Sequence, residues 1–124
     1  MKQMLGIIGL GNMGSSIVGA LVESFSPKEI VGYDCQASRN KSLKDRYKII
    51  IARDIRELLR LCRAVILSVK PQDLETLLKD IRDNLPERKI LFISIAAGVR
   101  LRFLEKYLGN NPVIRVMPNL GAWV

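Results

Sequence analysis

The chain has 124 residues, of which 48% are hydrophobic and 26% charged, as expected for one soluble globular domain with a single core. Its 20 basic and 12 acidic residues give a formal net charge of +8, but the basic residues are dispersed and not interleaved with aromatic residues, which argues against a nucleic-acid interface. No apolar stretch approaches the roughly 20 residues that span a bilayer, and no secretory signal opens the chain, so we expect a cytoplasmic protein.

Short apolar runs separated by turn residues predict the strands. The run MLGIIGL at 4–10 suits a strand that is buried on both faces of a parallel sheet. Further runs rich in β-branched and apolar residues predict strands at 30–33, 49–51, 64–69, 89–95 and 113–116.

Segments with apolar residues at helical spacing lie between these strands. The first helix follows a glycine-rich turn and runs to Phe25, where Ser26 and Pro27 end it. Later helices are predicted at 38–47, after Asp54, from Pro71, and through Leu101, Leu104 and Leu108. Strands that alternate with helices predict an α/β fold, a Rossmann-like doubly wound parallel sheet in a single domain over residues 1–124.

A glycine-rich motif stands between the first strand and the first helix. The segment Gly9-Leu10-Gly11-Asn12-Met13-Gly14 is a GxGxxG sequence in the structural context that gives this motif meaning. Gly9 permits the tight turn, Gly11 lets the backbone approach a pyrophosphate, and Gly14 lets the helix pack closely on the sheet. Free N–H groups at the start of the helix then bind the phosphates. We assign Gly9, Gly11, Asn12, Met13 and Gly14 to a dinucleotide site.

The end of the second strand bears on the choice between NAD and NADP. Asp34 lies about 20 residues beyond the motif, where an acid accepts hydrogen bonds from the adenosine ribose hydroxyls and favours NAD. Ser38, Arg39 and Lys41 follow directly, and such groups bind a 2′-phosphate through charge-assisted hydrogen bonds. An equal alternative is that Arg39 and Lys41 are exposed helix residues. From these residues alone, the sequence leaves the choice open.

Three further segments follow the ends of the fourth, fifth and sixth predicted strands. They are Val69-Lys70-Pro71-Gln72, Ser94-Ile95-Ala96-Ala97-Gly98-Val99 and Arg115-Val116-Met117-Pro118-Asn119. Because ligands of open α/β sheets bind at the carboxyl ends of the strands, we expect the three segments to meet at one crevice.

The first two segments each have a functional and a plainer interpretation. Lys70 offers a cation near an anionic ligand while Pro71 starts a helix; the plainer alternative is a surface lysine at a strand end. The small residues from Ala96 to Gly98 allow the backbone to approach a nicotinamide ring closely; the alternative is a simple tight turn. We add to the candidate site Val69, Lys70, Pro71, Ala96, Ala97 and Gly98.

The two cysteines and the absence of histidine limit the chemistry. Cys35 and Cys62 are far apart and have no CxxC partner, so we predict two reduced thiols and neither a disulfide framework nor a zinc site. No histidine is present, which excludes imidazole acid–base catalysis within this chain.

Together with GLGNMG, the three strand-end segments resemble pyrroline-5-carboxylate reductases, in the order and at about the spacing of that family's cofactor-binding half. The resemblance implies hydride transfer from NADPH or NADH to the C=N bond of 1-pyrroline-5-carboxylate, giving proline, with NADPH slightly favoured. It also implies that Asn119 lies beside the nicotinamide, with Met117 as an apolar wall. The family usually continues with threonine and proline where this chain has Leu120 and Gly121.

In that family a helical carboxy-terminal domain supplies the pocket for the substrate carboxylate, a catalytic segment and the dimer interface. These parts are not recognised in the 124 residues. We therefore expect a domain that binds the dinucleotide, has no catalytic residue of its own and cannot turn over the imino-acid substrate without the missing domain. An apolar patch left uncovered would favour homo-oligomers.

Two other functions stay open. The Leu120-Gly121 pair favours a non-catalytic nucleotide-binding regulatory protein that resembles the late-competence proteins. A β-hydroxyacid dehydrogenase also begins with GLGxMG, but it should carry a serine–threonine loop where this chain has Ser94-Ile95-Ala96-Ala97-Gly98. We therefore rank the dehydrogenase below the regulatory protein.

Overall fold

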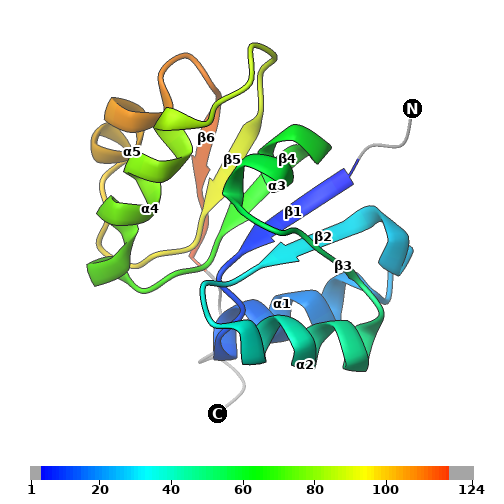
Figure 1. The fold of residues 1–124 in the computed structure, drawn as a ribbon. Helices are drawn as coiled ribbons and strands as arrows, with labels where there is room; N and C mark the ends of the chain where they lie inside the picture. The colour runs from blue at the N-terminus through cyan, green and yellow to red at the C-terminus, as the bar shows by residue number, and fades with distance from the viewer. Residues whose placement is uncertain (1–3, 118–124) are drawn as a thin grey trace.

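β1 (Met4–Ile8) lies inside a parallel sheet and pairs with β2 (Ile30–Tyr33) on one side and β4 (Cys62–Leu67) on the other. The computed structural model describes residues 4–117, and its other strands are β3 (Ile50–Ile51), β5 (Leu91–Ser94) and β6 (Val113–Arg115). Neighbouring strands are all parallel, in the order β3-β2-β1-β4-β5-β6 (Figure 1). The direction of winding reverses between β1 and β4, which is where doubly wound sheets bind ligands.

Helices cover both faces of the sheet. On one face lie α1 (Asn12–Leu21) and α2 (Ala37–Tyr47), and on the other lie α3 (Ile55–Leu61), α4 (Pro71–Asp83) and α5 (Leu101–Leu108) (Figure 1). The larger core gathers around Phe92, which is fully buried. The predicted Rossmann-like α/β sheet is confirmed. No helix within residues 4–117 is long and apolar enough to cross a membrane.

Some predicted boundaries differ from the structure for local reasons. β1 ends at Ile8 instead of residue 10, because Gly9 has a φ of +99°, which lies outside the strand region. β4 begins at Cys62, two residues before the predicted start, and ends at Leu67. The pairing of β1 with β4 therefore stops just before the glycine-rich turn.

The connection after α1 also differs from the prediction. α1 ends at Leu21 instead of Phe25, and Pro27–Glu29 forms a 3-10 helix, η1, that the sequence analysis did not predict. Ser26 caps η1, and the Glu29 carboxylate accepts a hydrogen bond from the Ser26 N–H at 3.1 Å. This reciprocal capping stabilises a turn too short to show helical periodicity.

Arg88 closes the carboxyl end of α3. Its guanidinium donates to the carbonyl oxygens of Leu59 at 2.6 Å, Arg60 at 2.6 Å and Cys62 at 2.8 Å. The last carbonyls of a helix have no partner within it, so a cation that donates to them satisfies these groups. The positive charge also interacts favourably with the negative end of the helix dipole. Arg88 thus joins the start of β4 to the segment before β5.

We predict that Arg88→Met lowers the free energy of unfolding by about 1–3 kcal/mol, because charge-assisted hydrogen bonds to the end of α3 are lost. Urea denaturation measures this change. Arg63→Met is the control, since Arg63 is an exposed residue of β4 and its replacement should change stability by less than about 0.5 kcal/mol. Equal effects of the two changes would contradict the capping role.

The two cysteines have opposite environments. Cys35 is exposed and Cys62 is buried, and burial raises the pKa of the Cys62 thiol from 9.0 to about 12. Because the thiolate is the reactive form, Cys62 should be inert in the folded chain.

We predict that Ellman's reagent at pH 8 labels one thiol per folded chain and two per chain in denaturant. Cys35→Ser should abolish labelling of the folded chain, because Cys62 keeps its proton at this pH. Rapid labelling of folded Cys35→Ser would show that Cys62 is accessible.

Candidate functional site

Two glycines of the GxGxxG turn are required by the backbone geometry, whether or not a ligand is bound. Gly9 has a φ of +99°, and a Cβ added there would lie 2.7 Å from the carbonyl oxygen of Ser68. A Cβ added to Gly14 would overlap the carbonyl oxygen of Gly9. Gly9 and Gly14 therefore let α1 begin directly against the end of β1, as the sequence analysis expected.

Gly11 has a different environment, because no backbone atom is among the nearest neighbours of its Cβ position. It is the N-cap of α1, its φ of −72° suits any residue, and no side chain caps the first turn of this helix. The three atoms nearest to a Cβ added there belong to the Arg39 guanidinium, at 3.7–3.8 Å. The backbone N–H groups of the first turn, from Asn12 to Gly14, have no partner within the helix and lie at its positive end.

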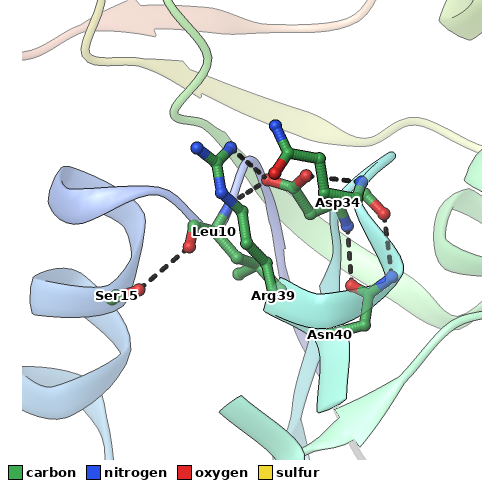
Figure 2. A network of polar contacts seen from close by, with 6 residues as sticks. Leu10, Ser15, Asp34, Arg39 and Asn40 are labelled. Carbon is green, nitrogen blue, oxygen red and sulfur yellow. Dashed lines mark hydrogen bonds and ion pairs between the residues drawn. The ribbon is translucent and has the colours of Figure 1, made fainter. Parts of the chain in front are cut away.

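A polar network connects this loop to the end of β2 (Figure 2). The Asp34 carboxylate, on a residue only 5% exposed, accepts a hydrogen bond from the Leu10 N–H at 2.7 Å. The carbonyl oxygen of Leu10 in turn accepts from the Ser15 hydroxyl at 3.0 Å. The side chain of Asn40 bonds both the N–H and the carbonyl oxygen of Asp34, at 2.9 and 2.8 Å.

Arg39 completes the network on its exposed side. Its guanidinium donates to the Asp34 carboxylate at 3.4 Å, and 42% of its side chain is exposed. Ser38 lies exposed in the same first turn of α2. Lys41 instead pairs with Asp45 at 2.8 Å on the same helix, and this hydrogen bond raises the pKa of Lys41. The structure therefore brings Arg39, but not the Lys41 ammonium, into contact with Asp34.

The end of β4 faces the glycine turn. The Ser68 hydroxyl is buried, has no hydrogen-bond partner among the described residues, and would lie 3.2 Å from a Cβ added to Gly14. Val69 is half-buried against the core, and Lys70 is exposed as the N-cap of α4, just before Pro71. The sequence analysis missed Ser68, although a hydroxyl at the end of an otherwise apolar strand was the available signal.

The loop after β5 presents mainly backbone. Ala97 and Gly98 are exposed, Ala96 is half-buried, and Gly98 has a φ of +73° with open space around it. The Arg115 guanidinium, at the end of β6, donates to the Val99 carbonyl oxygen at 2.7 Å. Arg115 thus ties two strand-end segments together, a contact that no sequence pattern indicates.

The last candidate residue, Asn119, lies outside the described residues together with Pro118, whereas Met117 is described and 72% exposed. Within residues 4–117, no group of His, Cys, Asp or Glu is arranged to hold a metal ion. The other candidate residues follow the carboxyl ends of parallel strands and so share one edge of the sheet.

This edge fits a dinucleotide on chemical grounds. Uncapped N–H groups at the start of α1 suit a diphosphate, and Gly11 has no side chain of its own to block its approach to the backbone. The unpartnered Ser68 hydroxyl adds a buried polar group at the turn. Exposed Arg39 adds positive charge beside it.

Comparisons with known proteins show the family of the chain. Residues 4–98 match the protein family described as NADP oxidoreductase coenzyme F420-dependent. The chain belongs to this family. One curated relative of the chain is the pyrroline-5-carboxylate reductase of Escherichia coli K12. The two are 35% identical over 127 residues, which cover 100% of this chain and 47% of that protein.

Solved structures give the same likeness. A pyrroline-5-carboxylate reductase from Coxiella burnetii matches 96% of this chain and 45% of its own chain, with a TM-score of 0.86 and 30% identity. The Plasmodium falciparum enzyme, solved with NADP bound, has a TM-score of 0.76 and 28% identity over 96% of this chain and 44% of its own. These matches confirm the predicted resemblance to pyrroline-5-carboxylate reductases. The chain spans about half the length of the relatives it matches.

We predict stability losses of very different size for two glycine substitutions. Gly14→Ala should lower the free energy of unfolding by about 3 kcal/mol or more, because the added methyl group overlaps the Gly9 carbonyl oxygen. Gly11→Ala should cost less than about 1 kcal/mol, because its φ and its surroundings accept a side chain. Urea denaturation of both variants compares the two costs, and similar values would contradict this division of roles.

Proposed function

We propose that this chain is the NAD(P)H-binding domain of a pyrroline-5-carboxylate reductase, an oxidoreductase that reduces 1-pyrroline-5-carboxylate to L-proline in proline biosynthesis. The proposal treats residues 1–124 as one dinucleotide-binding domain of a cytoplasmic protein. The observation that carries it is the uncapped start of α1 beside Gly11, at the position where the sheet reverses its winding.

The diphosphate would lie on the loop Gly9–Gly14. Backbone N–H groups of Gly11, Asn12 and Met13 are candidates to donate to it, and the positive end of α1 stabilises its charge. Gly9 and Gly14 contribute by bringing the helix start close to the sheet. No acidic side chain in the first turn of α1 opposes an anionic ligand.

The adenosine end would lie near Arg39 and Ser38, with Asp34 behind them. The exposed part of the Arg39 guanidinium can bind a 2′-phosphate, while the rest of the group stays with Asp34. This arrangement supports a preference for NADPH over NADH. NADP bound to the Plasmodium falciparum relative agrees with the preference.

The nicotinamide end would lie between the strand-end segments after β4 and β5. The candidates there are Val69, Lys70, Pro71, Ala96, Ala97, Gly98 and Asn119. When bound, the reduced nicotinamide supplies the hydride; the residues of this chain bind and orient the ring, and Lys70 supplies a nearby positive charge. The small residues after β5 leave the backbone open to the ring.

We assign the imino-acid pocket to the half of the relatives' length that this chain does not cover. Reduction by the 124 residues alone is therefore not expected. Self-association is also part of the proposal, because β6 and the residue pair after it expose Ile114, Val116 and Met117.

We predict that calorimetric titration at one fixed salt concentration gives a lower Kd for NADPH than for NADH. Arg39→Ala should raise the Kd for NADPH about tenfold or more, as for a lost charge-assisted hydrogen bond, and change the Kd for NADH about twofold at most. Arg46→Ala is the control, because it removes the same charge from the far end of α2.

Absence of binding by either nucleotide would contradict the proposed function. Binding without reduction of 1-pyrroline-5-carboxylate by the full-length gene product would favour the regulatory alternative instead.

A further inference from the structure

We propose that Asp34 is a positioning residue: its carboxylate holds the Leu10 peptide and thereby fixes the glycine-rich loop, while Arg39 discriminates between NADPH and NADH. This inference rests on the proposed binding of a nicotinamide dinucleotide. It departs from the usual role of an acid at the end of the second strand, which is to accept hydrogen bonds from ribose hydroxyls.

The N–H, the carbonyl oxygen and the side chain of Leu10 are each held by a contact. Its N–H donates to Oδ2 of Asp34 at 2.7 Å, and its carbonyl oxygen accepts from the Ser15 hydroxyl at 3.0 Å. The Leu10 side chain is 1% exposed and packs within the core under α1 and α2. Because Leu10 lies between Gly9 and Gly11, these contacts set the direction in which the loop enters α1.

Asp34 is itself fixed and has little freedom to turn outwards. Its Oδ1 accepts from the Gln36 N–H at 2.8 Å, so each carboxylate oxygen already has a main-chain partner. The Asn40 side chain bonds the main chain of Asp34 on both sides. With the residue only 5% exposed, a rotation towards a ribose would leave the buried Leu10 N–H without its acceptor, which is costly.

Arg39 lies beside this carboxylate, close to Leu10 of the glycine-rich loop (Figure 2). Its Nη1 is 3.4 Å from Oδ2 of Asp34, and its Cζ lies 3.7 Å from the Cβ position of Gly11. A positive group that covers the carboxylate reduces the repulsion between Asp34 and a 2′-phosphate. The acid therefore does not exclude NADPH, and the exposed Arg39 side chain is the group that meets the extra phosphate.

The test compares Asp34→Ala with Asp45→Asn, a control that removes an exposed carboxylate from α2. Calorimetry should show that Asp34→Ala raises the Kd for NADH and for NADPH by about tenfold each, within about threefold of one another. A ribose-binding Asp34 would instead weaken NADH and strengthen NADPH, and that result would overturn the proposal. Both Kd values are measured below the unfolding temperature of the variant. If Asp34 only stabilised the fold, the two Kd values would stay unchanged, and that result would also overturn the proposal.

A second readout does not need the nucleotide. Amide hydrogen exchange at Leu10 should become about tenfold faster in Asp34→Ala than in Asp45→Asn, while exchange at Val65 in β4 stays the same relative to the global stability. If Asp34→Ala does not fold, Asp34→Asn replaces it, and exchange at Leu10 and Gln36 is followed together, because the amide keeps the volume but offers one acceptor oxygen to two N–H groups, one of which should exchange faster. Should the unmodified chain bind neither nucleotide, the proposed function fails, and unchanged Leu10 exchange would separately overturn the positioning role.

Discussion

The close approach of α1 to the end of β1 is the constraint on which the rest of the site depends. Gly14 lies so near the Gly9 carbonyl oxygen that no other residue fits there, and this contact places the positive end of a helix at the centre of the sheet's carboxyl edge. A longer connection would move the free N–H groups away from the crevice between β1 and β4. The remaining groups of the site, from Arg39 to the loop after β5, are positioned around that point.

Buried polar side chains at the strand ends stabilise the turns around this contact. Asp34 and Ser94 are the buried polar residues among those described, and each lies at the end of a strand. Asp34 satisfies the Leu10 N–H, and the Ser94 hydroxyl accepts from the Ala96 N–H at 3.5 Å. A buried unpaired N–H costs free energy, so polar side chains at strand ends keep the irregular turns in one conformation. The mobility of a turn is thereby reduced before any ligand arrives.

The sequence predicted the sheet because its signals are local. Buried parallel strands are continuous apolar runs, and Asp54 and Pro71 mark the helix starts where the structure places them. The glycine turn was also predictable, since its spacing and position have a mechanical meaning. Exact strand ends were less predictable, because the φ of Gly9 ends β1 before its apolar run ends.

Tertiary contacts were beyond the reach of the sequence. Nothing in the pattern shows that the Asp34 carboxylate accepts hydrogen bonds from main-chain N–H groups, or that Arg115 reaches the Val99 carbonyl oxygen. The contacts of Asp34 with Leu10 and of Arg115 with Val99 join residues 24 and 16 positions apart, and their partners are backbone atoms that every residue carries. The sequence therefore predicted which edge of the sheet carries the candidate residues, while the partners of individual groups were not predicted.

The three glycines of the turn consequently differ in why a glycine is needed. Gly9 and Gly14 are required for the backbone to fold as it does, whereas Gly11 has an ordinary φ and its nearest neighbour is the end of the flexible Arg39 side chain. A descendant that lost its ligand but kept its fold would retain the first and third glycines and be free to exchange the second. Whether position 11 is still glycine therefore indicates, from the gene sequence alone, whether selection for ligand binding continues.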